Sequence, residues 1–409
     1  MRLLLILPTH TYQADAYMAA AQKLGVDLTV ASEVDSTFSR PEYEGLLTLD
    51  FCDPAAAAAA VEKFATQHPV NAVFGVDDRT SVVAAHVADR LSLPYSPITS
   101  VEAASNKLLQ RQTLAAAGIR VPTFALATLR DTPSHPHALA PPYPVVVKPL
   151  GLSASRGVIR ANNTDEFASA ASTIKDILRE EPDGIGEDGF LIEQYVPGRE
   201  YAVEGIVLEG DFRSYAIFEK PDPLDGPFFE ETIYLTPPRI EEDRRRRIVE
   251  GVQGAVAALG LTQGPVHAEV RVNGEDVWVI EVAARPIGGK CGRVLRFGEN
   301  GSISLEELNL AVATGLRSSV PALAPEASGV LMIPIPHAGV LERISGVDVA
   351  LAVTKVTDVV ITISLGTRLR RLPYESRYLG FIFARAETSG AVDRALRSAH
   401  SELHFTVSD

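Results

Sequence analysis

The sequence is poor in the residues that build disulfide frameworks and transition-metal sites. It contains two cysteines, Cys52 and Cys291, and nine histidines among 409 residues. Two cysteines are too few for a disulfide framework or a four-sulfur zinc site. Neither a CxxC nor an HExxH motif is present, so we expect no structural transition-metal site.

Long hydrophobic runs are also missing. No apolar stretch approaches the roughly 20 residues that a membrane-spanning helix requires. The run at residues 3–7 is short and ends at Pro8, which favours a buried first strand over a signal peptide. We therefore expect a cytoplasmic protein with no membrane partner.

Positive charge is in deficit. Lys and Arg number 38 against 52 Asp and Glu, so the formal net charge is −14. An acidic surface repels polyanions, so nucleic acid is not an expected partner, although a local basic pocket for one small anion remains compatible. With 46% hydrophobic and 22% charged residues the chain is globular, and its length predicts two to four domains.

Residues 1–100 alternate short apolar runs with longer amphipathic ones. The pattern predicts strands at 2–7, 27–31 and 72–75 and helices at 13–24, 54–67 and 80–91, hence a parallel sheet with helices on both faces. The first turn, residues 8–11, has no glycine, so it lacks the close backbone approach that a dinucleotide pyrophosphate needs.

The next segment offers cationic side chains. A helix is predicted at 106–117, where Lys107 and Arg111 share one face. Lys148 ends an apolar strand and precedes a Gly/Ser-rich loop at 151–157. Amide groups, hydroxyls and a lysine suit a triphosphate, and an ordinary turn beside an outward-pointing lysine is the alternative. The spacing does not match a Walker A loop.

Carboxylates follow in two places. Glu193 and Glu200 flank a bend with an apolar patch, which fits a purine and its ribose or a plain charged hairpin connection. Further on, Asn273-Gly274 predicts a hairpin of strands 266–272 and 277–282 that carries Glu269 and Glu281. Buried carboxylates need cations, so this pair predicts Mg²⁺ or Mn²⁺, or else a structural ion pair with Arg285.

The order of these elements resembles the ATP-grasp superfamily of carboxylate–amine ligases over roughly residues 1–315. Segments 220–232 and 281–289 look like the branch of the L-amino acid ligases and carnosine synthase, which joins two amino acids, or an amino acid and another carboxylate, by an amide bond. The resemblance implies a mixed α/β and α+β chain. An ATP-grasp fold would follow a Rossmann-like parallel-sheet domain and precede a small C-terminal α+β domain.

The resemblance also implies a domain division: 1–100, the N-terminal α/β domain; 101–195, the lid subdomain; 196–315, the subdomain with the metal site; and 316–409, the C-terminal domain. The last region has no dense polar cluster, so we expect it to pack rather than take part in chemistry. By analogy, residues 1–100 are a candidate homodimer interface.

Residue by residue, the resemblance implies an ATP site and a metal site. Lys107 and Lys148 would hold phosphates, and Ser153, Ser155 and Gly157 would belong to a mobile phosphate loop. Glu193 and Val196 would meet the adenine and Glu200 the ribose, while Glu269 and Glu281 would bind Mg²⁺ (or Mn²⁺). Many superfamily members have a metal-binding Asn two residues after the second Glu, where this chain has Ala283.

The implied chemistry needs no Ser, Cys or His nucleophile. ATP would phosphorylate a carboxylate, and an amine would then displace phosphate, with Lys148 and Arg285 stabilising the charge. The remaining candidates for substrate contacts are Glu230 and Glu231 for an ammonium, His267 for a proton, and Gly288 and Gly289 for side-chain room. The alternatives are a carboxylating or formyl-transferring enzyme of biotin or purine metabolism, and a nucleotide-binding protein without catalysis.

Overall fold

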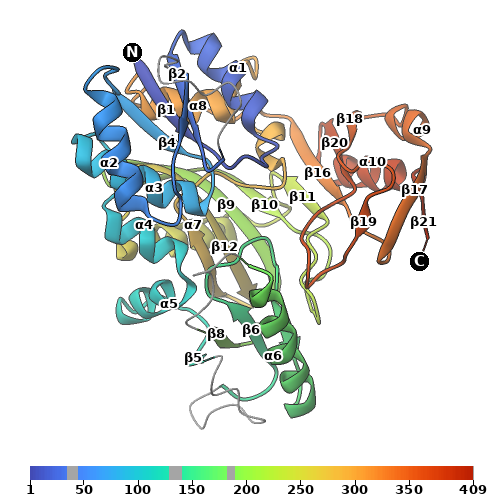
Figure 1. Cartoon of the computed structure of the whole chain (residues 1–409). Coiled ribbons are helices and arrows are strands. Elements are labelled where there is room, and N and C mark those ends of the chain that lie inside the picture. The colour runs from blue at the N-terminus through green and yellow to red at the C-terminus, as the bar shows by residue number, and fades with distance from the viewer. Residues whose placement is uncertain (35–44, 129–140, 182–188, 409) are drawn as a thin grey trace.

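The computed structural model describes residues 1–34, 45–128, 141–181 and 189–408. Figure 1 shows the N-terminal sheet domain at the upper left, a small sheet with helix α6 at the bottom and the C-terminal segment at the right. A long central sheet connects these parts.

The N-terminal domain is a parallel sheet between two layers of helices, as the sequence predicts. Its strand order is β3-β2-β1-β4. Side chains alternate along β1, so Leu4 and Ile6 pack beneath α2 and α3, while Leu3 and Leu5 face α1 and Leu310 of the distant helix α8. The elements are β1 (Arg2–Ile6), α1 (Ala14–Leu24), β2 (Asp27–Ser32), β3 (Leu46–Thr48), α2 (Pro54–Ala65), β4 (Ala72–Gly75) and α3 (Asp78–Leu91).

Two short helices connect this domain to the rest, α4 (Ile98–Ser105) and α5 (Lys107–Ala116). The sequence predicts α5 but not α4. Asn106 caps α5, because its side-chain oxygen accepts from the N–H groups of Leu108 and Leu109. Gln110 then holds α5 on the central sheet by exchanging two hydrogen bonds with the backbone of Val282, at 2.6 and 3.0 Å.

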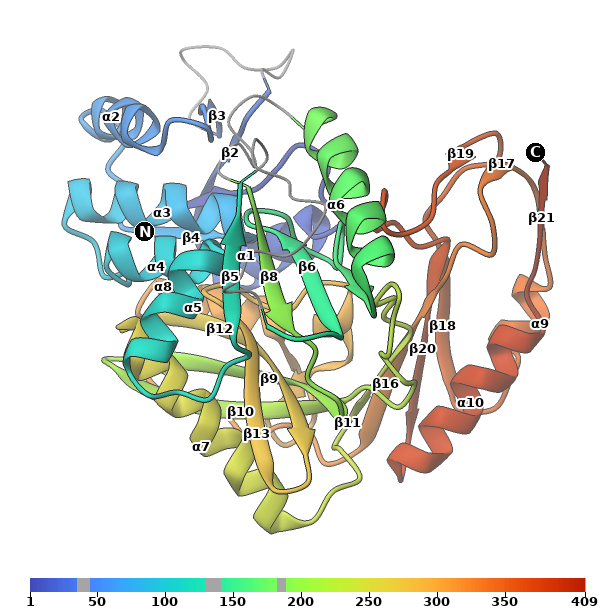
Figure 2. The same cartoon turned by 90° about the horizontal axis from the view of Figure 1, so that it is seen from below.

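A small sheet of order β5-β8-β6-β7 carries α6 on one face, and Figure 2 shows that helix alongside it. Phe167, Ile174 and Ile177 of α6 pack on Val145 and Val147 of the sheet. Its other face turns toward the large sheet. The elements are β5 (Phe124–Ala127), β6 (Val145–Pro149), β7 (Ile159–Ala161), α6 (Thr164–Arg179) and β8 (Phe190–Gln194).

The large sheet has eight strands in the order β13-β12-β9-β10-β11-β16-β20-β18. Helix α7 covers one face through Ile248, Val252 and Val256, and α8 packs on the other. The hairpin predicted at Asn273-Gly274 is confirmed as β12–β13. The elements are β9 (Arg199–Leu208), β10 (Asp211–Glu219), β11 (Ile233–Thr236), α7 (Glu242–Leu259), β12 (Gly264–Asn273), β13 (Asp276–Ala283), α8 (Leu305–Ala313), β16 (Ala327–Ile333), β18 (Val356–Ile361) and β20 (Gly380–Ala386).

The strands after residue 315 divide between two sheets. β16, β18 and β20 extend the large sheet across the boundary predicted at residue 315, whereas a three-stranded sheet of order β19-β17-β21 stands apart. Among the described residues no helix is long and apolar enough to cross a membrane. The remaining elements are η1 (Cys291–Val294), β14 (Arg296–Phe297), β15 (Ile303–Ser304), β17 (Gly339–Ser345), α9 (Val347–Leu351), β19 (Arg368–Leu369), α10 (Ser389–Ser401) and β21 (His404–Ser408).

Candidate active site

A cavity of about 310 Å³ opens where the N-terminal domain, the small sheet and the large sheet meet. All the site residues predicted from the sequence line it except Gly157 and Glu230. Residues from positions far apart in the chain thus converge on one space, and this cavity is the candidate active site.

Glu193 at the end of β8 is buried between two cations. Its carboxylate lies 2.7 Å from Nζ of Lys148 and 2.6 Å from Nε of Arg111. Burial raises the pKa of Glu193, but Arg111 and Lys148 together outweigh it, so the pKa is lowered. The sequence predicts Lys148 and Glu193 for the site but not Arg111, although Arg111 shares a helix face with Lys107.

The Gly/Ser loop lies against the cavity. Lys107 donates to the carbonyl of Leu152 at 2.5 Å, and Ser153 and Ser155 line the space. Gly157 lies behind the loop with φ +71°, and a Cβ there would meet the Pro149 ring at 2.6 Å. Gly157 therefore lets the loop close onto the end of β6 rather than contact the cavity.

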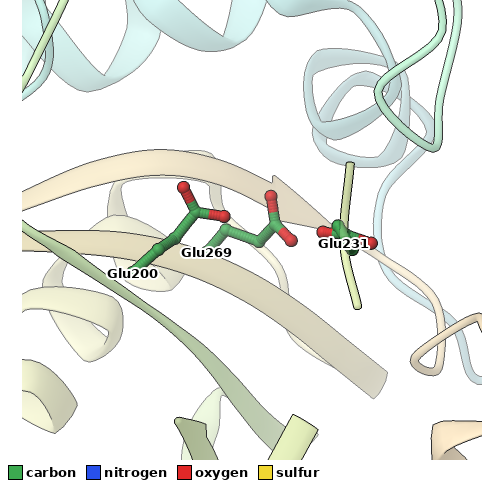
Figure 3. A group of neighbouring side chains, drawn as sticks. All are labelled: Glu200, Glu231 and Glu269. Atoms are coloured by element: carbon green, nitrogen blue, oxygen red, sulfur yellow. The ribbon is translucent and has the colours of Figure 1, made fainter. Parts of the chain in front are cut away.

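Lys220, which the sequence analysis missed, lies at the centre of an acidic cluster. Its ammonium is buried and lies 2.6–2.7 Å from carboxylate oxygens of Glu200, Glu231 and Glu269. Figure 3 shows these three carboxylates in a row, with Glu269 in the middle. Burial lowers the pKa of Lys220, but the three carboxylates outweigh it and hold the pKa well above its usual value. In the sequence, Lys220 begins the segment 220–232 that looks like the L-amino acid ligases, and this position is the signal that could have identified it.

The three carboxylates of this cluster do not titrate alike. Burial raises the pKa of Glu200, but Lys220 and Arg271 outweigh it and lower the pKa to about 2. For Glu269, burial together with the neighbouring Glu231 and Glu200 raises the pKa despite Lys220. Arg271 donates hydrogen bonds to the carboxylate of Glu200 and to the carbonyl of Val196, both at 2.8 Å. It therefore links two residues that are predicted to contact the nucleoside.

The predicted metal ligands lie opposite each other in the hairpin. Glu269 on β12 pairs in register with Glu281 on β13, so both side chains share one face of the sheet. Like charges directly opposite destabilise a sheet, and the only ion pair of Glu281 with a described residue is to Lys107 at 3.8 Å. Oxygen donors placed in this way fit a hard cation such as Mg²⁺ or Mn²⁺. Ala283 adds no ligand.

The three-carboxylate group is different from that pair. Oxygens of Glu200, Glu231 and Glu269 lie within 4.8 Å of one another, a spacing that also suits a metal. Lys220 already bonds to all three, so an ammonium neutralises this group. Glu269 belongs to both sets, so of these four carboxylates Glu281 is the one that has no ion pair with Lys220 among the described residues.

Two further ion pairs fix residues at the edge of the cavity. His267 bonds through Nδ1 to the buried carboxylate of Glu204 at 2.6 Å, which leaves Nε2 3.8 Å from Glu269. Arg285 bonds through Nε to Asp78 of α3 at 3.0 Å and through Nη1 to the carbonyl of Pro286 at 3.0 Å. Burial lowers the pKa of Arg285, but Asp78 outweighs it, so Arg285 stays charged.

The C-terminal region also contributes two side chains to the wall of the cavity. Met332 on β16 and Tyr378 line the space, because β16 and β20 extend the large sheet. Gly289 faces Met332, since a Cβ at this glycine would lie 2.8 Å from Sδ. Glu230, predicted to hold an ammonium, does not line the cavity, and burial raises its pKa.

Profiles of known protein families match three stretches of the chain. The ATP-grasp N-terminal domain matches residues 18–95, the ATP-grasp domain matches residues 141–294, and the L-amino acid ligase C-terminal domain 2 matches residues 331–408. The last match covers most of the region after residue 315. The three matches follow one another in the domain order expected from the sequence.

Among solved structures, an L-amino acid ligase from Bacillus licheniformis superposes with a TM-score of 0.85 and 27% identity, covering 100% of this chain and 99% of that one. Curated relatives include protein y4rH of Sinorhizobium fredii, 27% identical over 327 residues, and alanine–anticapsin ligase of Bacillus subtilis, 26% identical over 222 residues. The matches span 65% and 46% of those two proteins, so both are longer than the region they share with this chain.

Proposed function

We propose that this chain, which belongs to the ATP-grasp superfamily and carries the C-terminal domain of the L-amino acid ligases, is an ATP-dependent ligase that joins a carboxylate to an amine. The carboxylate substrate is an L-amino acid and the amine a second amino acid. The observation that carries the proposal is the convergence of Lys107, Lys148 and Arg285 with Glu269 and Glu281 on a single cavity.

The ATP half of the site lies between the small sheet and α5. Lys148 and Lys107 reach the cavity from different elements, and each bonds to neighbouring protein groups that hold its ammonium in place. Preorganised cations of this kind stabilise charge on a transferring phosphoryl group without reorganising during the reaction. The Gly/Ser loop at residues 151–157 closes over the phosphates, and Glu193, Val196 and Glu200 surround the nucleoside.

Glu269 and Glu281 would hold Mg²⁺ or Mn²⁺, which would neutralise phosphate charge when bound. The residues of the chain supply the rest. Arg285, fixed by Asp78, would bind the acyl phosphate and the oxyanion that forms when the amine attacks. Gly288 and Gly289 leave room for the acyl side chain, next to Met332 and Tyr378.

The reaction we propose has two balanced steps. A carboxylate oxygen attacks the terminal phosphorus of ATP, and ADP leaves with the electrons of the broken P–O bond. The amine then forms a C–N bond to the acyl carbon, phosphate leaves with the electrons of the C–O bond, and the nitrogen gives up a proton to His267 or a nearby carboxylate. Positioning and charge stabilisation suffice for both steps, because no covalent enzyme intermediate is required.

Release of ADP and phosphate from Mg²⁺-ATP, measured across a panel of paired amino acids, tests this proposal. A productive pair should raise release above the ATP-only background. Glu281→Gln should remove the stimulated release, and Glu275→Gln, an exposed position on the same hairpin, is the matched control that should not. If Glu281→Gln keeps the full stimulated release of ADP and phosphate, the metal assignment is wrong. If no pair in the panel stimulates release, the ligase proposal is wrong.

A further inference from the structure

A second cavity of about 390 Å³ adjoins the first one. It runs along α1 on one side and along residues 286–296 and the start of α8 on the other. Tyr12, Gln13, Pro286 and Ile287 line both cavities. The partition between them therefore consists of the Tyr12 turn and the segment directly after Arg285, and the second cavity lies next to the proposed site of amide formation.

Several ionic groups of the second cavity neutralise one another. Lys23 pairs with Glu307 at 2.5 Å, and Arg293 pairs with Asp358. Three charges remain. In the part of the chain that the structure describes, Lys290 and Arg296 have no carboxylate within ion-pair distance, and Glu306 has no cationic partner. The cavity thus has two uncompensated cations and one uncompensated carboxylate.

Lys290 lines the second cavity and lies against Tyr12 of the partition. Its ammonium lies 4.9 Å from the centre of the Tyr12 ring, 5.9 Å from that of Phe381, and donates to the carbonyl of Tyr12 at 3.4 Å. The backbone of Lys290 has φ 52°. This conformation is uncommon for a residue other than glycine, so the surrounding structure must hold Lys290 in it. Burial and the nearby Arg293 lower the pKa of Lys290, although Asp15 opposes this, so an added anion would be favourable here.

We propose that the second cavity binds the amine substrate as an α-amino acid, with Lys290 taking its α-carboxylate at the partition and the space toward Arg296 and Glu306 taking a polar side chain. This inference rests on the proposed ligase function. The amino and carboxylate groups of an amino acid share one carbon. A molecule held by its carboxylate beside Tyr12, which lines both cavities, would have its amino group next to the reaction cavity, where Arg285 would hold the acyl phosphate.

The test uses two kinds of nucleophile with the full-length enzyme. Hydroxylamine has no carboxylate and converts an acyl phosphate into a hydroxamate without using the proposed subsite. In Lys290→Met, the KM for the amine amino acid should rise about ten- to a hundred-fold, the effect of losing a charge-assisted hydrogen bond. The ratio of the variant and wild-type rates of hydroxamate formation should stay near one. The exposed Arg213→Ala serves as the control variant.

The carboxamide derivative of the amine substrate provides the second comparison. It lacks the α-carboxylate, so Lys290→Met should change its KM by less than two-fold. An unchanged KM for the free amino acid, an equal rise for the carboxamide, or a parallel loss of hydroxamate formation would each overturn the inference. If the wild-type enzyme forms no hydroxamate with any amino acid, the proposed function itself fails, and the inference fails with it.

Discussion

The acidic cluster around Lys220 allows a quantitative prediction of stability. Lys220→Met keeps a similar volume but removes the ammonium that bonds to Glu200, Glu231 and Glu269 at 2.6–2.7 Å. Removing one partner of a buried ion pair costs about 3–5 kcal/mol. The ammonium has three partners, so we expect a loss at the upper end of that range, a large part of the roughly 5–15 kcal/mol that stabilises a typical fold.

Urea unfolding followed by the fluorescence of Trp278, the only tryptophan, would measure this loss. In the variant the buried carboxylates repel one another, so their pKa values rise above those of the unfolded chain. Groups with a raised pKa are most stabilising at low pH, so the deficit should shrink as the pH falls from about 7 to about 5. Glu231→Gln added to Lys220→Met should recover part of the loss.

Divalent cations provide an independent check on the same cluster. In Lys220→Met, Mg²⁺ should raise the unfolding free energy more than it does in the wild-type chain, because the three carboxylates lie within 4.8 Å of one another and lose their ammonium. Lys63→Met, at an exposed position on α2, is the control. A loss below about 1 kcal/mol, the level of a surface ion pair, would show that these buried charges do not depend on Lys220.

Three further predictions concern other parts of the site and the sheet. Gly289→Leu should raise the KM of bulky acyl substrates at least ten-fold in steady-state assays, because its Cβ would lie 2.8 Å from Sδ of Met332 at a positive φ; an unchanged KM would show that the acyl group binds elsewhere. Arg111→Met should lower the free energy of unfolding in urea by about 3 kcal/mol and weaken ATP binding in calorimetry, because Lys148 would then be the remaining cation beside the buried Glu193. Unaltered ATP binding would show that Glu193 does not contact the nucleotide. Burial raises the pKa of Glu219, but Arg239 and Arg199 outweigh burial, so the pKa is lowered. Ionised Glu219 should therefore stabilise the fold above about pH 4.3, and this stabilisation should disappear as the pH falls through the pKa of Glu219 in the folded chain. The cost of Glu219→Gln in urea unfolding should therefore be larger at neutral pH than near pH 3, and a cost independent of pH would contradict this.

Local sequence patterns predicted much of the fold. The apolar alternation of the first 100 residues and the Asn273-Gly274 turn lead to the parallel sheet and the β12–β13 hairpin. These features depend on near neighbours in the chain. The return of α8 to the N-terminal sheet and the addition of β16, β18 and β20 to the large sheet depend on distant packing, which periodicity does not encode.

The candidate site divides in the same way. Glu269 and Glu281 stand out as charges within apolar strands, and Lys148 stands out beside a glycine-rich loop. Lys220, Arg111 and Asp78 lie in ordinary polar surroundings in the sequence, and their roles depend on partners 11 to 207 positions away. Tyr378 and Met332 look like core residues in the sequence, and only the extended large sheet brings them to the cavity.

The fate of the carboxylate oxygen shows whether the proposed acyl phosphate forms. An amino acid labelled with oxygen-18 in its carboxylate is incubated with ATP, Mg²⁺ and a productive amine, and the phosphate and the amide product are examined by mass spectrometry. An acyl phosphate predicts one labelled oxygen in the inorganic phosphate and the other in the amide. Label in AMP, or phosphate without label while the amide forms, would exclude an acyl phosphate intermediate.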